Sequence, residues 1–570
     1  MNFNDRQEIA ESRRVFFGAM NRAAPFTCIA LLSTACAGLY FYDLGSSPPY
    51  LSIDEVFQAR DAVTLATTGR NLTGDLFPLY FPDPGLPAGR DPIFIYLAAG
   101  LLRVLPFSET AARAPSAAVG VLNVVLMFLV AREIFGRTRP AVVAAGLLML
   151  APAHFLQSRI GHNQIGTVTC ALAWLLFLVR YFRTSRRRDL FLATTSLGLG
   201  LYMYAAGLVI MPVYFLVTLL VVYRRGTQST DTWIAAVTGF AIAFLPLALW
   251  YALHPERIAQ LVVNYTHGEY NRNLGLRGFW GADAIAHLDA WWDCYNPDKL
   301  FFSGDTDLRF STRSAGYFLL PASLPMVAGL WYGKRSMTFE IWTVVLCGLV
   351  LAPVPAALVS GSDVKRWLTF LPFAIVVTTF GAERLLAGGR AAVRMCALGL
   401  LLIGRWLTPV PSLILVAACG LLWLLAERRN AARACIVALL LLGVLQTKSF
   451  LDYYFGQYRI DSSDYYGGNL RDAIREVVSV STSQDCILLD TRVYYAEDHW
   501  DLYTRAYGRA DLARRTTWLN PEAVPNPQAW CQGTTALALV GDPRFASWRS
   551  RPIPELKGNV QFAVYRRDQS

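Results

Sequence analysis

Long apolar runs separated by short polar loops occupy most of the first 449 residues of the chain. A transmembrane helix needs about 20 predominantly apolar residues, and about thirteen segments approach or reach that length. They lie at roughly 24–43, 114–131, 140–157, 164–182, 190–203, 206–223, 232–252, 315–332, 339–358, 367–387, 392–404, 408–425 and 432–449. Because several of them are short, the pattern predicts a polytopic α-helical membrane protein with about 11–13 transmembrane helices.

Three polar regions are too long to be turns between spans: residues 44–113, residues 253–314 and the tail that follows residue 449. In the tail, NLRDAIREVV has the spacing of an amphipathic helix, whereas DCILLD, TALALVG and VQFAVYR have the length and composition of strands. We therefore predict a membrane domain over residues 1–449 and a small α/β domain over residues 450–570. No internal repeat pairs two broken helices, a feature of many secondary transporters.

The basic residues indicate how the spans are oriented. Arg13, Arg14 and Arg22 precede the first span, which predicts a cytoplasmic N-terminus and a retained anchor rather than a cleaved signal peptide. Alternation of the spans then places these basic segments inside: Arg132/Arg137/Arg139, RTSRRR, YRR, GKR, Arg390/Arg394 and ERRNAAR. The three long polar regions, including the α/β domain, are expected on the outside.

Composition agrees with this interpretation. Only 16% of the residues are charged, against about a quarter in soluble proteins. The net charge of +11 comes from residues in the short loops, and no basic stripe with interleaved aromatic residues is present. Nucleic acid is therefore not expected as a partner.

The sequence predicts no metal site and no cofactor. The ten cysteines include no C-x-x-C pair, and the histidines of the 253–314 loop lack i, i+4 spacing. GDTDLR (304–309) carries carboxylates that could suit a divalent cation, although solvated turn residues are the simpler interpretation. Asp305 in this segment could lie near a substrate cleft.

Two cysteines of the tail, Cys486 and Cys531, lie outside the apolar runs that hold most of the others. Buried cysteines in apolar runs behave as small core residues. If the tail lies in an oxidising compartment, we hypothesise a disulfide between Cys486 and Cys531.

The stretch YLSIDEVFQARD (50–61) places two adjacent carboxylates, Asp54 and Glu55, just beyond the first span. They could be solvated charges at a membrane exit. However, the helical pattern EVFQARDAVTLATTG continues without becoming a span, which predicts a helix along the membrane surface. Such a helix would hold Asp54 at the edge of a low-dielectric region, where a carboxylate can act as a general base.

These features resemble the GT-C fold glycosyltransferases, in particular the branch with protein O-mannosyltransferases and lipid A aminoarabinose transferases. Further segments carry the resemblance in the same order and spacing: RDPIFIYLAAGLLRVLPFSETAARAPSA (90–117), APAHFLQSRIGHNQI (151–165), YNPDKLFFSGDTDLRFSTRSAGYFLL (295–320) and SDVKRWLTFLPFAIV (362–376). The resemblance implies transfer of a sugar from a polyprenyl phosphate, outside the cytoplasm and with inversion at the anomeric carbon. It implies Asp54 as the catalytic carboxylate, with Glu55 as a supporting neighbour.

The departing lipid phosphate needs positive charge beside it. Arg159, Lys365 and Arg366 are candidates because each is expected at an outer span end, where basic residues are disfavoured. Lipid-headgroup anchors are the alternative interpretation. The match of Lys365–Arg366, beside Trp367, to a family element favours phosphate binding.

Other candidates for a sugar or acceptor pocket are His162 and Asn163, which follow Arg159, and Tyr202 and Tyr204 in GLYMYAAG. Many relatives carry an Asp near Asn163, and an amide cannot replace a carboxylate as a base, so a two-carboxylate mechanism is in doubt. The tyrosines suit an aromatic belt at the membrane interface better than a pocket.

We therefore expect an enzyme of the plasma (inner) membrane of a bacterium, acting on lipid A or lipopolysaccharide, on a glycan or on a protein. The fold does not choose among these acceptors. A transporter or flippase of lipid-linked sugars is the main alternative, although the expected spans are nearly free of central charges. WWDCYN (291–296) shares WWD with oligosaccharyltransferases but lies in another loop and lacks their following Gly, so N-glycosylation is not expected.

Overall fold

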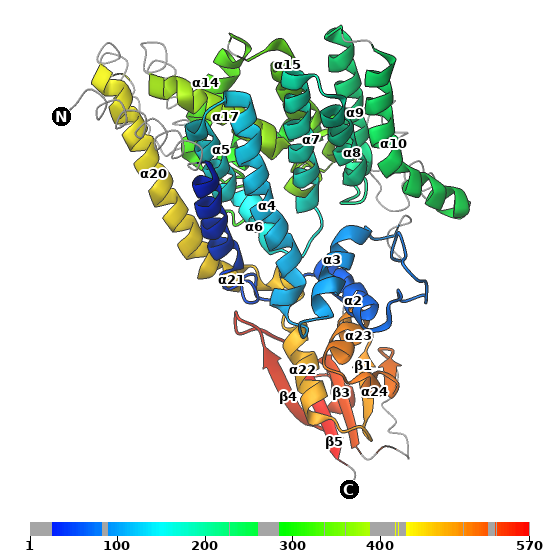
Figure 1. The fold of residues 1–570 in the computed structure, drawn as a ribbon. Helices are drawn as coiled ribbons and strands as arrows, with labels where there is room; N and C mark the ends of the chain where they lie inside the picture. The colour runs from blue at the N-terminus through cyan, green and yellow to red at the C-terminus, as the bar shows by residue number, and fades with distance from the viewer. Residues whose placement is uncertain are drawn as a thin grey trace, which may run out of the picture.

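The computed structural model describes residues 25–82, 89–226, 229–259, 284–335, 337–359, 361–387, 417, 420, 429–493, 495–522, 531 and 533–568. It consists of a helical bundle and a smaller domain with a β-sheet at one end of the bundle (Figure 1). Two short helices, α2 (Ile53–Thr68) and α3 (Pro92–Leu102), lie between these two parts.

Six helices of the described residues are long and apolar enough to cross a membrane. They are α4 (Glu109–Phe135), α7 (Ile165–Thr184), α9 (Gly207–Arg224), α10 (Thr230–Leu253), α15 with α16 (Phe339–Leu358) and α17 (Phe370–Ala387). Helices also form at four other expected spans: Pro25–Phe41, α8 (Arg187–Gly200), α14 (Ser323–Tyr332) and α20 (Arg429–Phe455). The helical membrane architecture is confirmed, and the expected spans 392–404 and 408–425 lie almost wholly outside the described residues.

The expected span 140–157 is broken in the structure. α5 (Thr138–Leu150) and α6 (Pro152–Arg159) meet at an angle of 59°. Pro152 has no N–H to continue the helix and keeps the preceding Ala151 extended, at φ −66° and ψ 117°. The bend sends the end of α6 into the interior, and every residue of α6 is buried.

The domain after α20 has a five-stranded mixed sheet. The strand order is β2-β1-β3-β5-β4, with β1 parallel to β2 and β3, and β5 antiparallel to β3 and β4. The strands are β1 (Cys486–Asp490), β2 (Thr516–Leu519), β3 (Gly533–Leu539), β4 (Arg549–Pro554) and β5 (Val560–Asp568), with α22 (Leu470–Val480) and α23 (Ala496–Ala506) packed against them. The expected α/β tail is therefore present, and the structure contains the hypothesised Cys486–Cys531 disulfide, with a Cα–Cα distance of 5.6 Å.

One hydrophobic core joins α2 to this domain. Val56, Ala59 and Val63 of α2, with Leu51 before it, pack with residues of α22, β1, α23 and β3. At the rim of the core, Arg60 of α2 forms an ion pair with Asp498 of α23. The orientation of α2 is therefore set by the sheet domain as well as by the bundle.

Candidate active site

The start of α2 determines where the Asp54 and Glu55 side chains point. Ser52 caps the helix by accepting a hydrogen bond from the Glu55 N–H, and Glu55 Oε2 accepts one from the Ser52 N–H at 2.8 Å. This reciprocal capping box fixes the first turn. Glu55 is buried, whereas the Asp54 side chain is 47% exposed.

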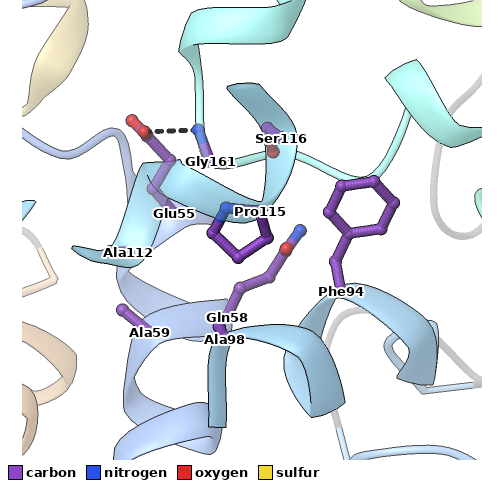
Figure 2. A pocket seen from close by; sticks show the side chains of 9 residues that line it. All are labelled: Glu55, Gln58, Ala59, Phe94, Ala98, Ala112, Pro115, Ser116 and Gly161. Atoms are coloured by element: carbon purple, nitrogen blue, oxygen red, sulfur yellow. Dashed lines mark hydrogen bonds between the residues drawn. The ribbon is translucent and has the colours of Figure 1, made fainter. Parts of the chain in front are cut away.

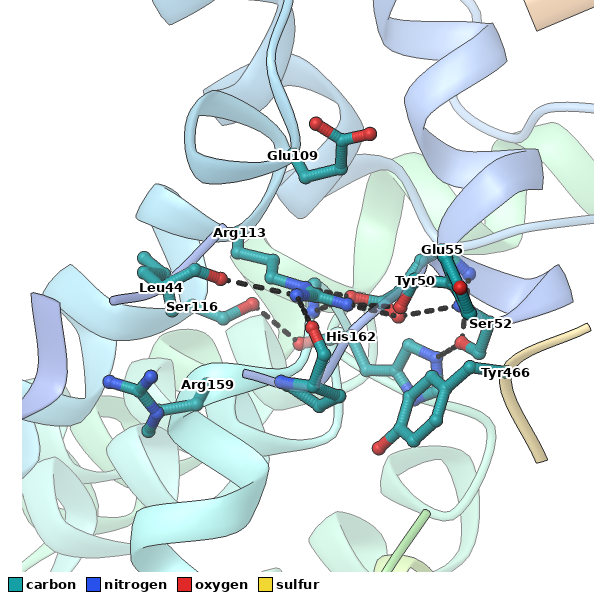
Figure 3. A network of polar contacts seen from close by, with 12 residues as sticks. Leu44, Tyr50, Ser52, Glu55, Glu109, Arg113, Ser116, Arg159, His162 and Tyr466 are labelled. Carbon is teal, nitrogen blue, oxygen red and sulfur yellow. Dashed lines mark hydrogen bonds and ion pairs between the residues drawn. The ribbon is translucent and has the colours of Figure 1, made fainter. Parts of the chain in front are cut away.

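Glu55 is the centre of a buried polar network, drawn in Figure 3. Its Oε1 accepts hydrogen bonds from Arg113 Nε of α4 and from the N–H of Gly161, each at 2.8 Å. Burial works against the charge, but Arg113 and these hydrogen bonds outweigh it and lower the pKa of Glu55. Arg113 also donates to the carbonyls of Leu44, Pro48 and Tyr50. The pair therefore ties the 44–55 loop, α4 and the loop after α6 together, and the Glu55 carboxylate has no freedom to react.

A cavity of about 10 Å³ lies behind this network, with room for about one water molecule. Figure 2 shows its lining: Glu55, Gln58, Ala59, Phe94, Ala98, Ala112, Pro115, Ser116 and Gly161. It is too small for a substrate. The candidate reaction site is therefore on the other side of the first turn of α2.

Asp54 lies there beside His162, with 4.0 Å between Oδ2 and Nε2. The same His162 nitrogen is 3.0 Å from Ser52 Oγ. His162 is completely buried, and burial lowers its pKa although Asp54 and Glu55 oppose the effect. The imidazole is therefore neutral near pH 7 and supports Asp54 without forming a full ion pair.

Lys365 provides positive charge next to Asp54. It belongs to the 3-10 turn η4 (Val364–Arg366), and its ammonium group lies 4.4 Å from the centre of the Phe310 ring. It makes no hydrogen bond or ion pair with any residue that the structure describes. Burial lowers the pKa of Lys365, and Asp54 is the largest influence that raises it. Lys365 and Asp54 therefore interact electrostatically.

Two arginines lie within electrostatic reach of Lys365. Arg309 pairs with Asp307 at 2.7 Å; burial lowers its pKa, and Asp307 and then Asp54 raise it. Arg366 pairs with Asp363 at 2.7 Å and is one quarter exposed. The sequence analysis did not identify Arg309, which lies in GDTDLR and could have been noted as a basic residue in an outer loop.

Asp305 supports η4. It is buried, its Oδ2 accepts the Val364 N–H at 2.9 Å, and its Oδ1 accepts the Tyr317 hydroxyl at 2.6 Å. Burial raises its pKa to about 6. Within the described residues, no group of three or more His, Cys, Asp or Glu side chains could hold a metal ion.

Arg159 is not part of this cluster, which corrects the expectation for it. Its guanidinium is completely buried and uses every N–H group on the Tyr454 hydroxyl and on the carbonyls of Leu39, Tyr40, Asp43 and Ser47. The bend at Pro152 carries Arg159 into the interior, where it fastens the end of the first helix. It has no donor left for a phosphate.

A second carboxylate, Asp91, comes close to the site from the first loop. Asn163 Nδ2 donates to Asp91 Oδ2 at 2.9 Å. Sequence reasoning missed Asp91, although an Asp directly before the proline of RDPIFIY is a recognisable helix start. The amide of Asn163 therefore binds a carboxylate that another loop supplies.

The two tyrosines differ. The Tyr202 hydroxyl donates to the Ala243 carbonyl at 2.7 Å and accepts the Leu247 N–H at 3.0 Å, where Pro246 interrupts α10. It is a structural contact. Burial raises the pKa of Tyr204; Arg366 lowers it, and Asp54 and Asp91 raise it further, so Tyr204 lies within electrostatic reach of both carboxylates.

Residues 87–250 match the model of a family described as dolichyl-phosphate-mannose-protein mannosyltransferase. No curated protein matches the sequence. Among solved structures, the chain is similar to ArnT from Cupriavidus metallidurans bound to undecaprenyl phosphate, with 14% identity and a TM-score of 0.53 over 94% of this chain and 97% of ArnT. The apo form of ArnT gives 13% identity and a TM-score of 0.52 over 95% and 98%. The structural matches confirm the expected GT-C fold, and residues 87–250 are similar to a glycosyltransferase family.

Proposed function

We propose that this chain, whose residues 87–250 carry the sequence of the dolichyl-phosphate-mannose-protein mannosyltransferase family, transfers a sugar from a polyprenyl phosphate to an acceptor of the cell envelope. The reaction is expected on the outer face of the plasma membrane, with the sheet domain on that side. The observation that carries the proposal is the pair of Asp54 and Lys365: a half-exposed carboxylate beside an ammonium group without an ion-pair partner among the described residues.

The chemistry needs these two charges in different roles. Asp54 takes the proton of the acceptor hydroxyl as its oxygen attacks the anomeric carbon. The bond from that carbon to the phosphate oxygen breaks, and the lipid phosphate leaves with the electron pair. Inversion requires attack opposite the leaving group, so the base and the phosphate site lie on opposite sides of the sugar.

Lys365 is proposed to hold the departing phosphate, with Arg366 and Arg309 beside it. Charge-assisted hydrogen bonds to phosphate are stronger than neutral ones, and they stabilise the charge that develops as the bond breaks. ArnT, which shares the fold, has been crystallised with undecaprenyl phosphate, and this supports a lipid phosphate as the ligand of these residues.

The test is transfer by the purified protein in lipid vesicles, using polyprenyl phosphates that carry different radiolabelled sugars and envelope extracts as acceptors. Asp54→Asn should fold and insert normally but transfer sugar about 10²–10⁴-fold more slowly. Asp452→Asn, an exposed carboxylate elsewhere in the chain, is the matched control. Full activity of Asp54→Asn with a hydroxyl acceptor would rule out Asp54 as the general base. Envelope glycans compared between cells with and without the gene would identify the acceptor.

A further inference from the structure

The Asp91 side chain faces away from its own helix. Asp91 is the N-cap residue of α3, with φ −66° and ψ 138°, but its carboxylate makes no cap hydrogen bond. An Asp at this position normally binds the free N–H groups of the first turn. Here the carboxylate points across to the loop after α6 and accepts the Asn163 amide N–H at 2.9 Å. This contact, and not the start of α3, determines the orientation of Asp91.

Among the described residues, no Lys, Arg or His is a resolved influence on the pKa of Asp91. The neighbouring Arg90 is turned to Asp61, with 2.7 Å between Nη2 and Oδ2, and both side chains of that pair are buried. Burial raises the pKa of Asp91 to about 7, and only hydrogen bonds from Asn163 and its own backbone oppose it. Near neutral pH a large fraction of Asp91 is therefore a carboxylic acid that can donate as well as accept.

The hydroxyl groups of Tyr80 and Tyr204 lie within electrostatic reach of this acid. The Tyr80 hydroxyl is buried and has no hydrogen-bond partner among the residues that the structure describes. Burial raises the pKa of Tyr80, and Asp91 is the next largest cause. The Tyr80 ring packs against Trp250, with centroids 4.9 Å apart. Tyr251 and Tyr202 also act on Tyr80, and Arg366, Asp54, Asp91 and Asp363 act on Tyr204. The neighbouring His162 is influenced by Asp54, Glu55, Lys365 and Arg309.

We propose, on the basis of the proposed function, that Asp91, Asn163 and Tyr80 bind the hydroxyl groups of the donor sugar ring, and that this sugar is uncharged. An amide, a carboxyl group and a tyrosine hydroxyl, next to aromatic faces, have the donors and acceptors that a polyhydroxylated ring needs. The protonated acid donates to one sugar hydroxyl through Oδ1, while Oδ2 accepts from Asn163 and from a second hydroxyl.

The electrostatics of the transfer favour a neutral acid at this place. The reaction releases an anionic phosphate at the Lys365 site, and a second negative charge near the sugar would oppose that release. A carboxylic acid offers the same hydrogen bonds without the charge. An amino sugar would instead draw the proton from Asp91 and form an ion pair, so the sugar specificity is part of the test.

Binding measurements can distinguish the sugar subsite at Asp91 from the phosphate site at Lys365. In equilibrium dialysis with full-length protein in nanodiscs, the wild type should bind a polyprenyl-phosphate hexose about tenfold more tightly than the bare polyprenyl phosphate. Asp91→Ala should remove that preference and leave affinity for the bare lipid, whereas Lys365→Ala should weaken both. If Asp91→Ala keeps the preference for the sugar-bearing lipid, or if an amino-sugar donor binds more tightly than the hexose, the proposal is wrong.

The pH profile gives a second readout. The wild type should lose transfer efficiency, as kcat/KM for the donor, by about tenfold per pH unit above pH 7, because Asp91 ionises there. Asp91→Asn, which cannot ionise, should lose this decline while keeping more activity than Asp91→Ala. A decline that persists in Asp91→Asn would contradict the role of the acid. If the wild type transfers no sugar from any polyprenyl-phosphate donor, the proposed function is wrong. If Asp54→Asn is inactive but the Asp91 variants behave like the wild type, the proposed function stands and only the sugar subsite is wrong.

Discussion

The carboxylate of Glu55 and the guanidinium of Arg113 form an ion pair with 2.8 Å between Oε1 and Nε, and both side chains are excluded from solvent. The pair joins the helix that carries Asp54 to α4, one of the apolar helices. It also binds the backbone of the loop before α2 and of the loop after α6. Glu55 therefore fixes the geometry of the first turn of α2, while the side chain of Asp54 stays half-exposed.

Arg113→Leu should lower the free energy of unfolding by about 3–5 kcal/mol, because it leaves the Glu55 charge buried and unpaired. Lys448→Ala, which breaks the exposed Lys448–Asp452 pair, should cost about 0–1 kcal/mol. Thermal unfolding of the two variants in detergent measures the difference. Equal melting temperatures would show that the network does not support the fold.

Lys365→Ala should raise the donor KM by about 10–100-fold, which corresponds to one charge-assisted hydrogen bond to phosphate. The melting temperature should stay close to that of the wild type, since Lys365 makes no hydrogen bond or ion pair among the described residues. Initial rates over a range of donor concentrations give the KM. An unchanged donor KM would return Lys365 to the role of a lipid-headgroup anchor.

Arg159→Lys should lower the stability of the protein and leave its donor KM unchanged. An ammonium group cannot reach the hydroxyl and the four carbonyls that the planar guanidinium binds. The variant should therefore unfold at a lower temperature, while the folded fraction keeps the wild-type donor KM. A higher KM without loss of stability would restore a phosphate-binding role.

His499 should make the sheet domain sensitive to acid. Burial lowers its pKa from 6.5 to about 4 in the folded protein, so the unfolded chain binds a proton first as the pH falls. Its contribution to stability is present above pH 6.5 and is lost between pH 6.5 and 4, by up to about 1.4 kcal/mol per pH unit.

Melting temperatures between pH 7 and 4.5 test this effect. The decline should be shallower in His499→Gln than in the wild type, whereas His254→Gln, a half-buried histidine at the end of α10, should leave it unchanged. Parallel declines in all three proteins would assign the acid sensitivity to other groups.

Features that depend on local pattern were predictable from the sequence. The helix after Asp54, the helix at NLRDAIREVV and the strands β1, β3 and β5 appear where period and composition indicated. The strands β2 and β4 were not predicted. The break at Pro152 was not predicted, because the apolar run continues through it. A proline within a hydrophobic segment is compatible with a continuous span as well as with a bend.

Contacts between distant segments could not be predicted. Asp91 and Asn163 are 72 residues apart, and no periodicity of either segment indicates that they meet. Arg159 was assigned to the surface from its place at a span end, but the bend two turns earlier carries it inside. The family resemblance singled out Asp54 because that residue lies in a motif, and its catalytic role stays a prediction. Arg309 and Asp91 lie in no such motif, and their positions follow from the folded chain.

The core that α2 shares with α22, β1 and α23 has a consequence for engineering. Asp54 is carried by a helix that packs on the sheet domain, whereas Lys365 is carried by a turn between bundle helices. A chimaera that exchanges only the tail after residue 449 with that of a relative would leave Leu51, Val56 and Val63 against a foreign surface. The exchangeable unit is therefore discontinuous in sequence: the tail has to be transplanted together with α2 for the two charges to face each other.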